Sequence, residues 1–214
     1  MRRVVVLVLL ALALPIAASA GTIDIMNEFG SISITTAGIS SIGSQLKYFN
    51  GITPIPASHS LGTVSFTTGA LTSGSIYSGG TFAGGSASSF DVFGVGAWAK
   101  ALVGCTSCKN PITLFVGSFV GAADWNLLAV GGPFGQTRWY SLTGTIAGWL
   151  YGGRWVTGTT TQDFISTNGQ ISQGVGHILV GNSQLTVPEP GTLGLLGTGL
   201  VGIAGLFRRK LIGS

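Results

Sequence analysis

Two cysteines, Cys105 and Cys108, stand in the stretch CTSC and have the spacing of a redox dithiol, half a metal site or a short disulfide loop. A redox dithiol of this type belongs to a βαβ setting, whereas the surrounding sequence is typical of strands. A metal site would need His59 and His177, which are distant in the sequence and form no ligand pattern. We expect a disulfide that stiffens its turn locally, with no metal and no cofactor.

Carboxylates are the next residues that could catalyse a reaction. Hydrolysis needs two positioned carboxylates, or a nucleophile beside its base. The sequence holds no Gly-x-Ser-x-Gly elbow, no phosphate-binding loop before a helix and no Asp-rich calcium loop. We therefore expect no catalytic residue and a protein that is not an enzyme. A glycan-active hydrolase is kept as an alternative, which requires Asp91, Asp124 or Asp163 to lie about 5 to 10 Å apart in an open cleft.

Tryptophans could bind sugars instead. On an exposed sheet face they stack on sugar rings, and inside a glycine-rich domain they fill the core. Burial is the general expectation, and Trp139, Trp149 and Trp155 are the candidate glycan contacts, where an exposed aromatic pair is most expected. The Thr-rich stretch TGTTTQ at 157–162 resembles a hydroxyl array for ice or glycan contact but has no repeat. A carbohydrate-binding module is thus a second alternative, with polysaccharide as its partner.

The distribution of charge argues against a nucleic-acid partner. Only 7% of the 214 residues are charged, against about 25% in a typical soluble protein, and the pI is about 9.4. Between residues 21 and 186, five acidic residues balance five basic ones. The basic excess therefore belongs to the two ends, and the body carries no electrostatic footprint for nucleic acid. The basic residues at the ends are Arg2, Arg3, Arg208, Arg209 and Lys210.

The elements that must position these residues are strands. Apolar and polar residues alternate in GSISITT, with Ile32 and Ile34 on one face, and in TVSFTT, with Val64 and Phe66 on one face. The stretch ITLFVGSFV at 112–120 is apolar on both faces, which favours a central strand buried on both sides. Asn168-Gly169 separates two such runs and predicts a hairpin.

These patterns predict an all-β fold over residues 21–186, with mainly antiparallel strands in a single β-sandwich or jelly-roll-like domain. Gly and Ser dominate residues 69–89, which we expect to form either a mobile loop or strands of small residues.

Residues 1–20 have the three parts of a secretory signal peptide. Arg2 and Arg3 precede an apolar run of about 11 residues, and Ala18 and Ala20 offer small side chains to signal peptidase. The run is well short of the roughly 20 residues that a membrane anchor needs. We expect cleavage after Ala20 and a mature chain that begins at Gly21.

Residues 187–210 combine three features in order: the triplet Pro188-Glu189-Pro190, the uncharged run 191–207, and the basic cluster Arg208-Arg209-Lys210. As a helix the run would be about 25 Å long, which suits one membrane span. The basic cluster predicts a cytoplasmic end, as Arg2 and Arg3 do. Both ends thus lie on one side of the membrane, and residues 21–186 lie across it.

This order of triplet, span and basic cluster resembles the PEP-CTERM sorting signal of exported bacterial proteins. The resemblance implies that Pro188, Glu189 and Pro190 are recognised by exosortase, a membrane-embedded cysteine transpeptidase that cleaves near them. Flanking prolines keep Glu189 extended and available to a protease groove. The chain is then anchored only until it is processed, and is delivered to the cell surface or extracellular matrix.

Overall fold

The computed structural model describes residues 21–167 and 170–187. Thr22–Thr186 form one compact unit, which is flanked by the described residues Gly21 and Val187. The expected signal peptide (1–20), sorting triplet (188–190), apolar run (191–207) and basic cluster (208–210) lie outside the described residues. Within the two described ranges, none of the helices has the length and hydrophobicity that crossing a membrane requires.

Antiparallel strands make up most of this unit, with one short α-helix and three 3-10 turns. The strands are β1 (Thr22–Glu28), β2 (Ser31–Thr35), β3 (Gly38–Ile42), β4 (Ser44–Phe49), β5 (Gly62–Thr67), β6 (Leu71–Ser75), β7 (Gly79–Phe82), β8 (Ser89–Gly94), β9 (Ile112–Phe119), β10 (Ala123–Gly131), β11 (Thr137–Leu150), β12 (Arg154–Ser166) and β13 (Val175–Thr186). The helical segments are η2 (Gly85–Ala87), α2 (Ala97–Leu102), η3 (Pro133–Gly135) and η4 (Gln170–Gln173). The Gly/Ser-rich stretch 69–89 therefore contains small-residue strands, which was one of its two expected forms.

Short strands continue one another across bends. Glu28 of β1 pairs with Val180 of β13, and Ser31 of β2 pairs with His177, so the register along β13 runs on through the bend. In the same way β3 continues as β4, β5 as β6, β7 as β8 and β9 as β10. The thirteen strands of the described residues therefore behave as eight long ones.

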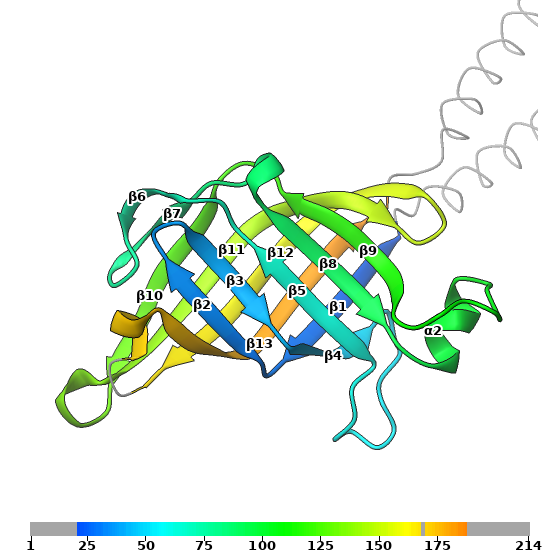
Figure 1. The fold of residues 1–214 in the computed structure, drawn as a ribbon, viewed down its shortest axis with the longest axis horizontal. Helices are drawn as coiled ribbons and strands as arrows, with labels where there is room; N and C mark the ends of the chain where they lie inside the picture. The colour runs from blue at the N-terminus through cyan, green and yellow to red at the C-terminus, as the bar shows by residue number, and fades with distance from the viewer. Residues whose placement is uncertain (1–20, 168–169, 188–214) are drawn as a thin grey trace, which may run out of the picture. The chain divides into compact units, whose positions relative to one another are not determined.

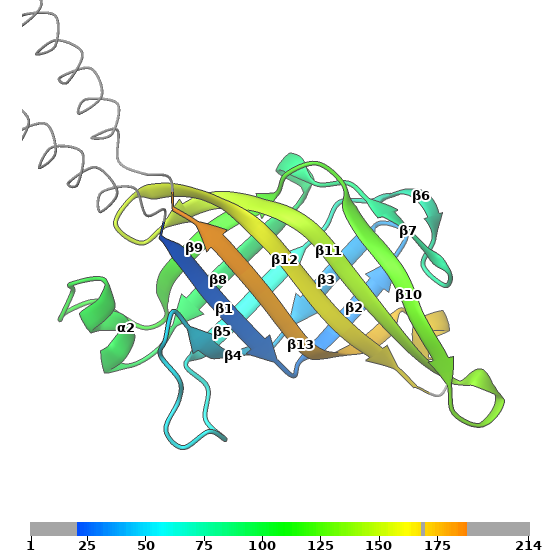
Figure 2. The same ribbon diagram turned by 180° about the vertical axis from the view of Figure 1, so that it is seen from behind.

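The eight long strands follow one another around a closed barrel in chain order. The last strand, β13, pairs with both β12 and β1, so the sheet has no free edge around this ring. Figure 1 shows β2, β3, β5 and β8 on the near side, and Figure 2 shows β1, β13, β12, β11 and β10 on the other.

The predicted all-β antiparallel fold is confirmed, but the predicted sandwich is wrong, because one continuous sheet closes on itself. Alternation of apolar and polar residues reports only that each strand buries one face. A barrel and a sandwich both satisfy that pattern, and the pairing of the first and last strands leaves no local signal.

Aromatic side chains fill the barrel interior. Phe66 lies 6.0 Å from Phe90 and 6.2 Å from Phe164 between ring centroids, and Trp125 stacks on Tyr140 at 4.6 Å. All five side chains are buried, and such pairs add to the free energy gained from burial alone.

The predicted inward faces of the two short strands are confirmed, since Ile32, Ile34, Val64 and Phe66 are all buried. The prediction that residues 112–120 are buried on both faces is wrong, because Val116 and Val120 are exposed. In the barrel, β9 has β8 on one side and β11 on the other, and the face that holds Val116 points outward to solvent.

A buried polar cluster lies among strands β1, β12 and β13. Asn27 and Gln162 both pair in register with Gly181, which lies on the strand between them. Their amides meet over this glycine: the Asn27 Nδ2 donates to Gln162 Oε1 at 3.0 Å, and the Gln162 Nε2 donates to Asn27 Oδ1 at 3.2 Å. A Cβ on residue 181 would collide with both amide oxygens, so any other residue here would displace the pair. Ser44 and Thr160 accept the remaining hydrogen bonds of the pair.

The two ends of the barrel differ in what they carry. At one end, called the exit end below, lie Gly21, Val187, the loops 50–61 and 95–111 and the turn 151–153. At the other, called the far end, lie the connections 36–37, 76–78 and 132–136, residue 167 and the segment 170–174. The alternation of strand direction around the ring dictates this division.

We predict that Gln162→Ala lowers the free energy of unfolding by about 2 to 4 kcal/mol, because it leaves a cavity and removes partners from the buried Asn27 amide. Urea unfolding of the purified protein measures this. The neighbouring exposed variant Thr161→Ala is the control and should stay within about 0.5 kcal/mol of wild type. Equal unfolding midpoints for the two variants would show that the amide pair does not hold the barrel closed.

Candidate functional site

The chain enters and leaves the barrel at neighbouring points on the exit end. Thr22 pairs with Thr186, and the Val187 N–H donates a hydrogen bond of 2.9 Å to the Gly21 carbonyl. The predicted processing residues beyond these points, Ala18 and Ala20 on one side and Pro188, Glu189, Pro190, Arg208, Arg209 and Lys210 on the other, lie outside the described residues. Whatever each end is joined to, the two connections emerge side by side.

An exposed tryptophan pair lies close to these exits. Trp149 of β11 and Trp155 of β12 pair in register, next to the turn 151–153. Their ring centroids are 5.2 Å apart with the planes at 77°, and they are 52% and 49% exposed. Val116 of β9 pairs with Trp149 on its other side and is also exposed. The three side chains form an apolar row over β9, β11 and β12.

Trp139 does not belong to this row. It lies ten residues before Trp149 on the same strand, which corresponds to about 33 Å. Of the other tryptophans, Trp125 is buried in the core and Trp98 of α2 is half-buried. The structure therefore brings together two of the three candidate glycan contacts, and their perpendicular rings do not form a flat platform.

The loop 95–111 holds the cysteines against the exit end. Cys105 and Cys108 form a disulfide with their Cα atoms 5.7 Å apart. In the same loop, the Trp98 Nε1 donates to the Leu61 carbonyl at 3.2 Å, and its ring lies 6.1 Å from that of Phe49. These contacts fix α2 and the disulfide to the barrel rim.

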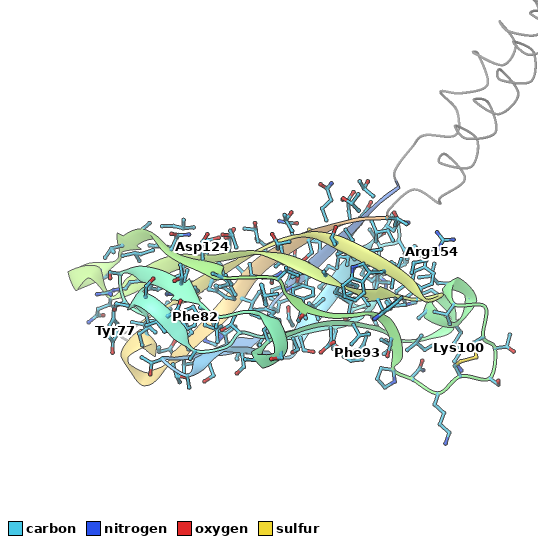
Figure 3. The ribbon with its side chains drawn as sticks, turned by 90° about the horizontal axis from the view of Figure 1, so that it is seen from above. Tyr77, Phe82, Phe93, Lys100, Asp124 and Arg154 are labelled. Atoms are coloured by element: carbon cyan, nitrogen blue, oxygen red, sulfur yellow. A yellow bond between two sulfur atoms is a disulfide. The ribbon has the colours of Figure 1, made fainter. Side chains whose placement is uncertain are left out.

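Charge is distributed unevenly between the two ends, although the domain is neutral in total. Lys100, Lys109 and Arg154 lie on the loop 95–111 and beside the turn 151–153, all at the exit end. Figure 3 shows Lys100 and Arg154 at one end of the domain, with Asp124 toward the other. Lys47 is also near the exit end, but it is buried and donates to the carbonyls of Ala57 and His59.

The acidic residues lie mainly elsewhere on the barrel. Glu28 is the last residue of β1. Asp124 lies in the half of the long strand formed by β9 and β10 that is nearer the far end, and Asp163 lies in the corresponding half of β12. Asp91 lies on β8, three residues before the strand ends at Gly94. Asp24 and Asp91 lie nearer the exit end: Asp24 accepts a hydrogen bond from Gln184, and Asp91 pairs in register with Val116, the neighbour of Trp149. The exit end is therefore positively charged.

The three carboxylates considered for catalysis are not brought together. Asp124 and Asp163 lie on either side of β11 opposite Thr143 and Ser141, which separates their Cα atoms by about 12 Å. Asp91 is on β8, with β9 between it and β11. His59 lies in the loop 50–61 and His177 toward the far end of β13. Within the described ranges, no three His, Cys, Asp or Glu side chains gather as metal ligands would.

Uncharged polar side chains form rows on the outer face of β11, β12 and β13, between the Trp149–Trp155 pair and Asp163. Thr159 pairs with Thr145 on one side and with Gln184 on the other, and all three are exposed. The next row on this face consists of Thr143, Thr161 and Asn182. Rows are spaced about 4.8 Å across the strands and about 6.8 Å along them. The Thr-rich stretch thus belongs to a regular array of hydroxyls and amides that spans three strands.

The fold defines an antiparallel β-barrel domain whose ends emerge together, and one comparison adds to this. The model of the PEP-CTERM protein-sorting motif matches residues 186–210, which begin at the last residue of β13. The chain therefore carries a PEP-CTERM sorting motif, as its triplet, apolar run and basic cluster indicate. This motif implies export and processing by exosortase. No curated protein and no solved structure matches the chain.

Sequence reasoning missed two features of this site. The positive charge of the exit end comes from residues of the loop 95–111 and the start of β12. Adding the charges along the sequence shows only that the domain as a whole is neutral. The buried amide pair joins residues 135 positions apart, and its one local sign is a glycine at position 181 within an alternating strand.

We predict that Asp91→Asn raises the melting temperature at neutral pH. Burial raises the pKa of the Asp91 carboxyl above its ordinary value, and the backbone hydrogen bond with Gly117 offsets only part of this. The folded state thus holds the proton more tightly than the unfolded state, so this residue lowers stability as pH rises from about 4. Thermal melts at several pH values test it, with Asp124→Asn as the charge-matched control on β10. A lower melting temperature for Asp91→Asn at neutral pH would contradict this account.

Proposed function

We propose that this protein is an exported surface or extracellular-matrix protein, anchored in the membrane by the run 191–207 until exosortase processes it, and that it is not an enzyme. The observation that carries the proposal is the sorting motif at residues 186–210. The position of the motif supports it, because the triplet begins two residues after β13 ends. A protease can therefore act there without entering the ladder of the barrel.

The N-terminus of the domain suits the same route. Signal peptidase cleaving after Ala20 would leave Gly21 as the first residue, and β1 begins at Thr22. Removal of both terminal segments would thus leave the barrel strands whole. A non-catalytic role is favoured by the separation of Asp91, Asp124 and Asp163 over different strands.

Carbohydrate binding is the second candidate, now favoured by the outer face of β11, β12 and β13. Its rows of Thr, Asn and Gln offer donors and acceptors at regular spacing, with the carboxylates of Asp24 and Asp163 only at their margins. Such a face suits a neutral polysaccharide of the matrix that would receive the protein.

Replacing Glu189 and Pro190 together with alanine should block processing, because the extended recognition stretch loses its charge and one of its prolines. The variant is expected to keep its C-terminal segment and remain in the membrane fraction, as read from the mass of the recovered protein. The control replaces Pro54 and Ile55 with alanine, since Pro54-Ile55-Pro56 is another Pro-x-Pro stretch, in the exposed part of the loop 50–61. Normal processing of the Glu189→Ala, Pro190→Ala variant would refute the sorting proposal.

The carbohydrate candidate predicts that Thr145→Val and Thr159→Val weaken binding to extracellular polysaccharide of the producing cells. Each variant keeps the branched shape and loses one hydroxyl, which should cost about fivefold in affinity. Pull-down of the purified protein on immobilised polysaccharide measures this. Thr113→Val, at an exposed position of β9, is the matched control. Equal retention of all three variants would remove this candidate.

A further inference from the structure

The length of the chain between the barrel and the apolar run limits how far the exit end can lie from a membrane. Val187 is the last described residue and Gly191 begins the run, so four residue steps separate them. Fully extended, four steps span at most about 14 Å. If the run lies in the bilayer, as the proposed function has it, the point where Val187 leaves the barrel is held within this distance of the apolar run.

The exposed side chains at this end are those that a bilayer surface attracts. Trp149 and Trp155 are about half exposed, and tryptophan is enriched where membranes meet water because its ring is apolar and its N–H is polar. Thr157 of β12 pairs with Thr186, the last residue of β13, and with Ala147 of β11. Trp155 lies two residues closer to the exit end than Thr157. The tryptophan pair is thus at the rim from which the chain leaves.

The charges of this end complement an anionic surface. Lys109 and Arg154 are exposed and Lys100 is half-buried, and these three cations outnumber the two carboxylates near the exit end among the described residues, Asp24 and Asp91. Juxtamembrane Lys and Arg are attracted to anionic headgroups. The far-end halves of the strands hold Asp124 and Asp163, so a membrane would attract one end of this neutral domain and not the other.

We propose that the exit end is a membrane-contact surface, in which Trp149 and Trp155 enter the headgroup region of an anionic bilayer and Lys100, Lys109 and Arg154 face its phosphates. This rests on the proposed function, because it requires the run 191–207 to be membrane-inserted. The contact orients the barrel before processing and keeps the sorting triplet at the depth where a membrane-embedded protease works. Cleavage of the segment removes this short tether, and the barrel can then dissociate from the membrane.

Tryptophan fluorescence of the full chain tests the proposal directly, because all five tryptophans lie in the described barrel. The chain is reconstituted into vesicles of phosphatidylcholine and phosphatidylglycerol that contain lipid brominated high in the acyl chain. We expect quenching in wild type, loss of quenching in the double variant Trp149→Phe, Trp155→Phe, and wild-type quenching in Trp139→Phe. Because the two replaced side chains are exposed, folding should be retained, which equal urea midpoints would verify.

Charge is tested with the variant Lys100→Gln, Lys109→Gln, Arg154→Gln. Its quenching should fall in the anionic vesicles, and wild-type quenching should fall at high salt, where the screening length shrinks to about 3 Å. Arg138→Gln removes one charge near the far end of β11 and should change nothing.

The possible results separate this proposal from the proposed function. Chain that floats with the vesicles but shows no quenching overturns membrane contact and leaves anchoring intact. Chain that does not float at all overturns both. If the tryptophan pair is unquenched by lipid and is shielded from soluble acrylamide only when extracellular polysaccharide is added, the surface is a glycan contact and the membrane proposal fails.

Discussion

The pairing of the first strand with the last is the constraint on which the rest of the structure depends. β13 lies between β1 and β12, and Gly181 lets the amides of Asn27 and Gln162 meet above it inside the barrel. A buried amide left without its partner is costly, so this pair favours one register over its neighbours. A slip of a single residue would turn the whole strand inside out. Closure therefore fixes both the ring and the place where the two chain ends emerge.

Closure also decides where function can reside. The interior of an eight-stranded ring is just wide enough for side chains, and here phenylalanines, Trp125 and Tyr140 occupy it. Every buried side-chain nitrogen and oxygen of the described residues has a hydrogen-bond partner, so the polar cluster among them is satisfied within the protein. Recognition is thus left to the outer face and the two ends. The outer face of β11, β12 and β13 offers hydroxyls, and the exit end offers aromatic rings and positive charge.

The sequence predicted what local patterns can encode. Alternation identified Ile32, Ile34, Val64 and Phe66 as inward-facing, and the sorting motif was recognisable from residues 188–210 alone, because triplet, run and cluster are contiguous. It did not distinguish barrel from sandwich, since that choice depends on β13 meeting β1 across the whole length of the domain. The burial of Val116 was overestimated for a related reason. An apolar residue on a strand says nothing about whether another layer covers it, and no layer covers the outside of a barrel.

The structure also bears on what the proposed removal of both terminal segments would do to the ring of strands. The ladder between β1 and β13 begins at Thr22 and Thr186, so every backbone bond that closes the ring lies inward of both predicted processing segments. Beyond that ladder, the hydrogen bond from Val187 to Gly21 is the last link between the two ends among the described residues. Cleavage after Ala20 leaves Gly21 in place, and cleavage anywhere beyond Val187 leaves the ring closed. A barrel closed within its own strands therefore fits the proposed route of anchoring followed by release, because the ladder that closes it lies within Thr22–Thr186.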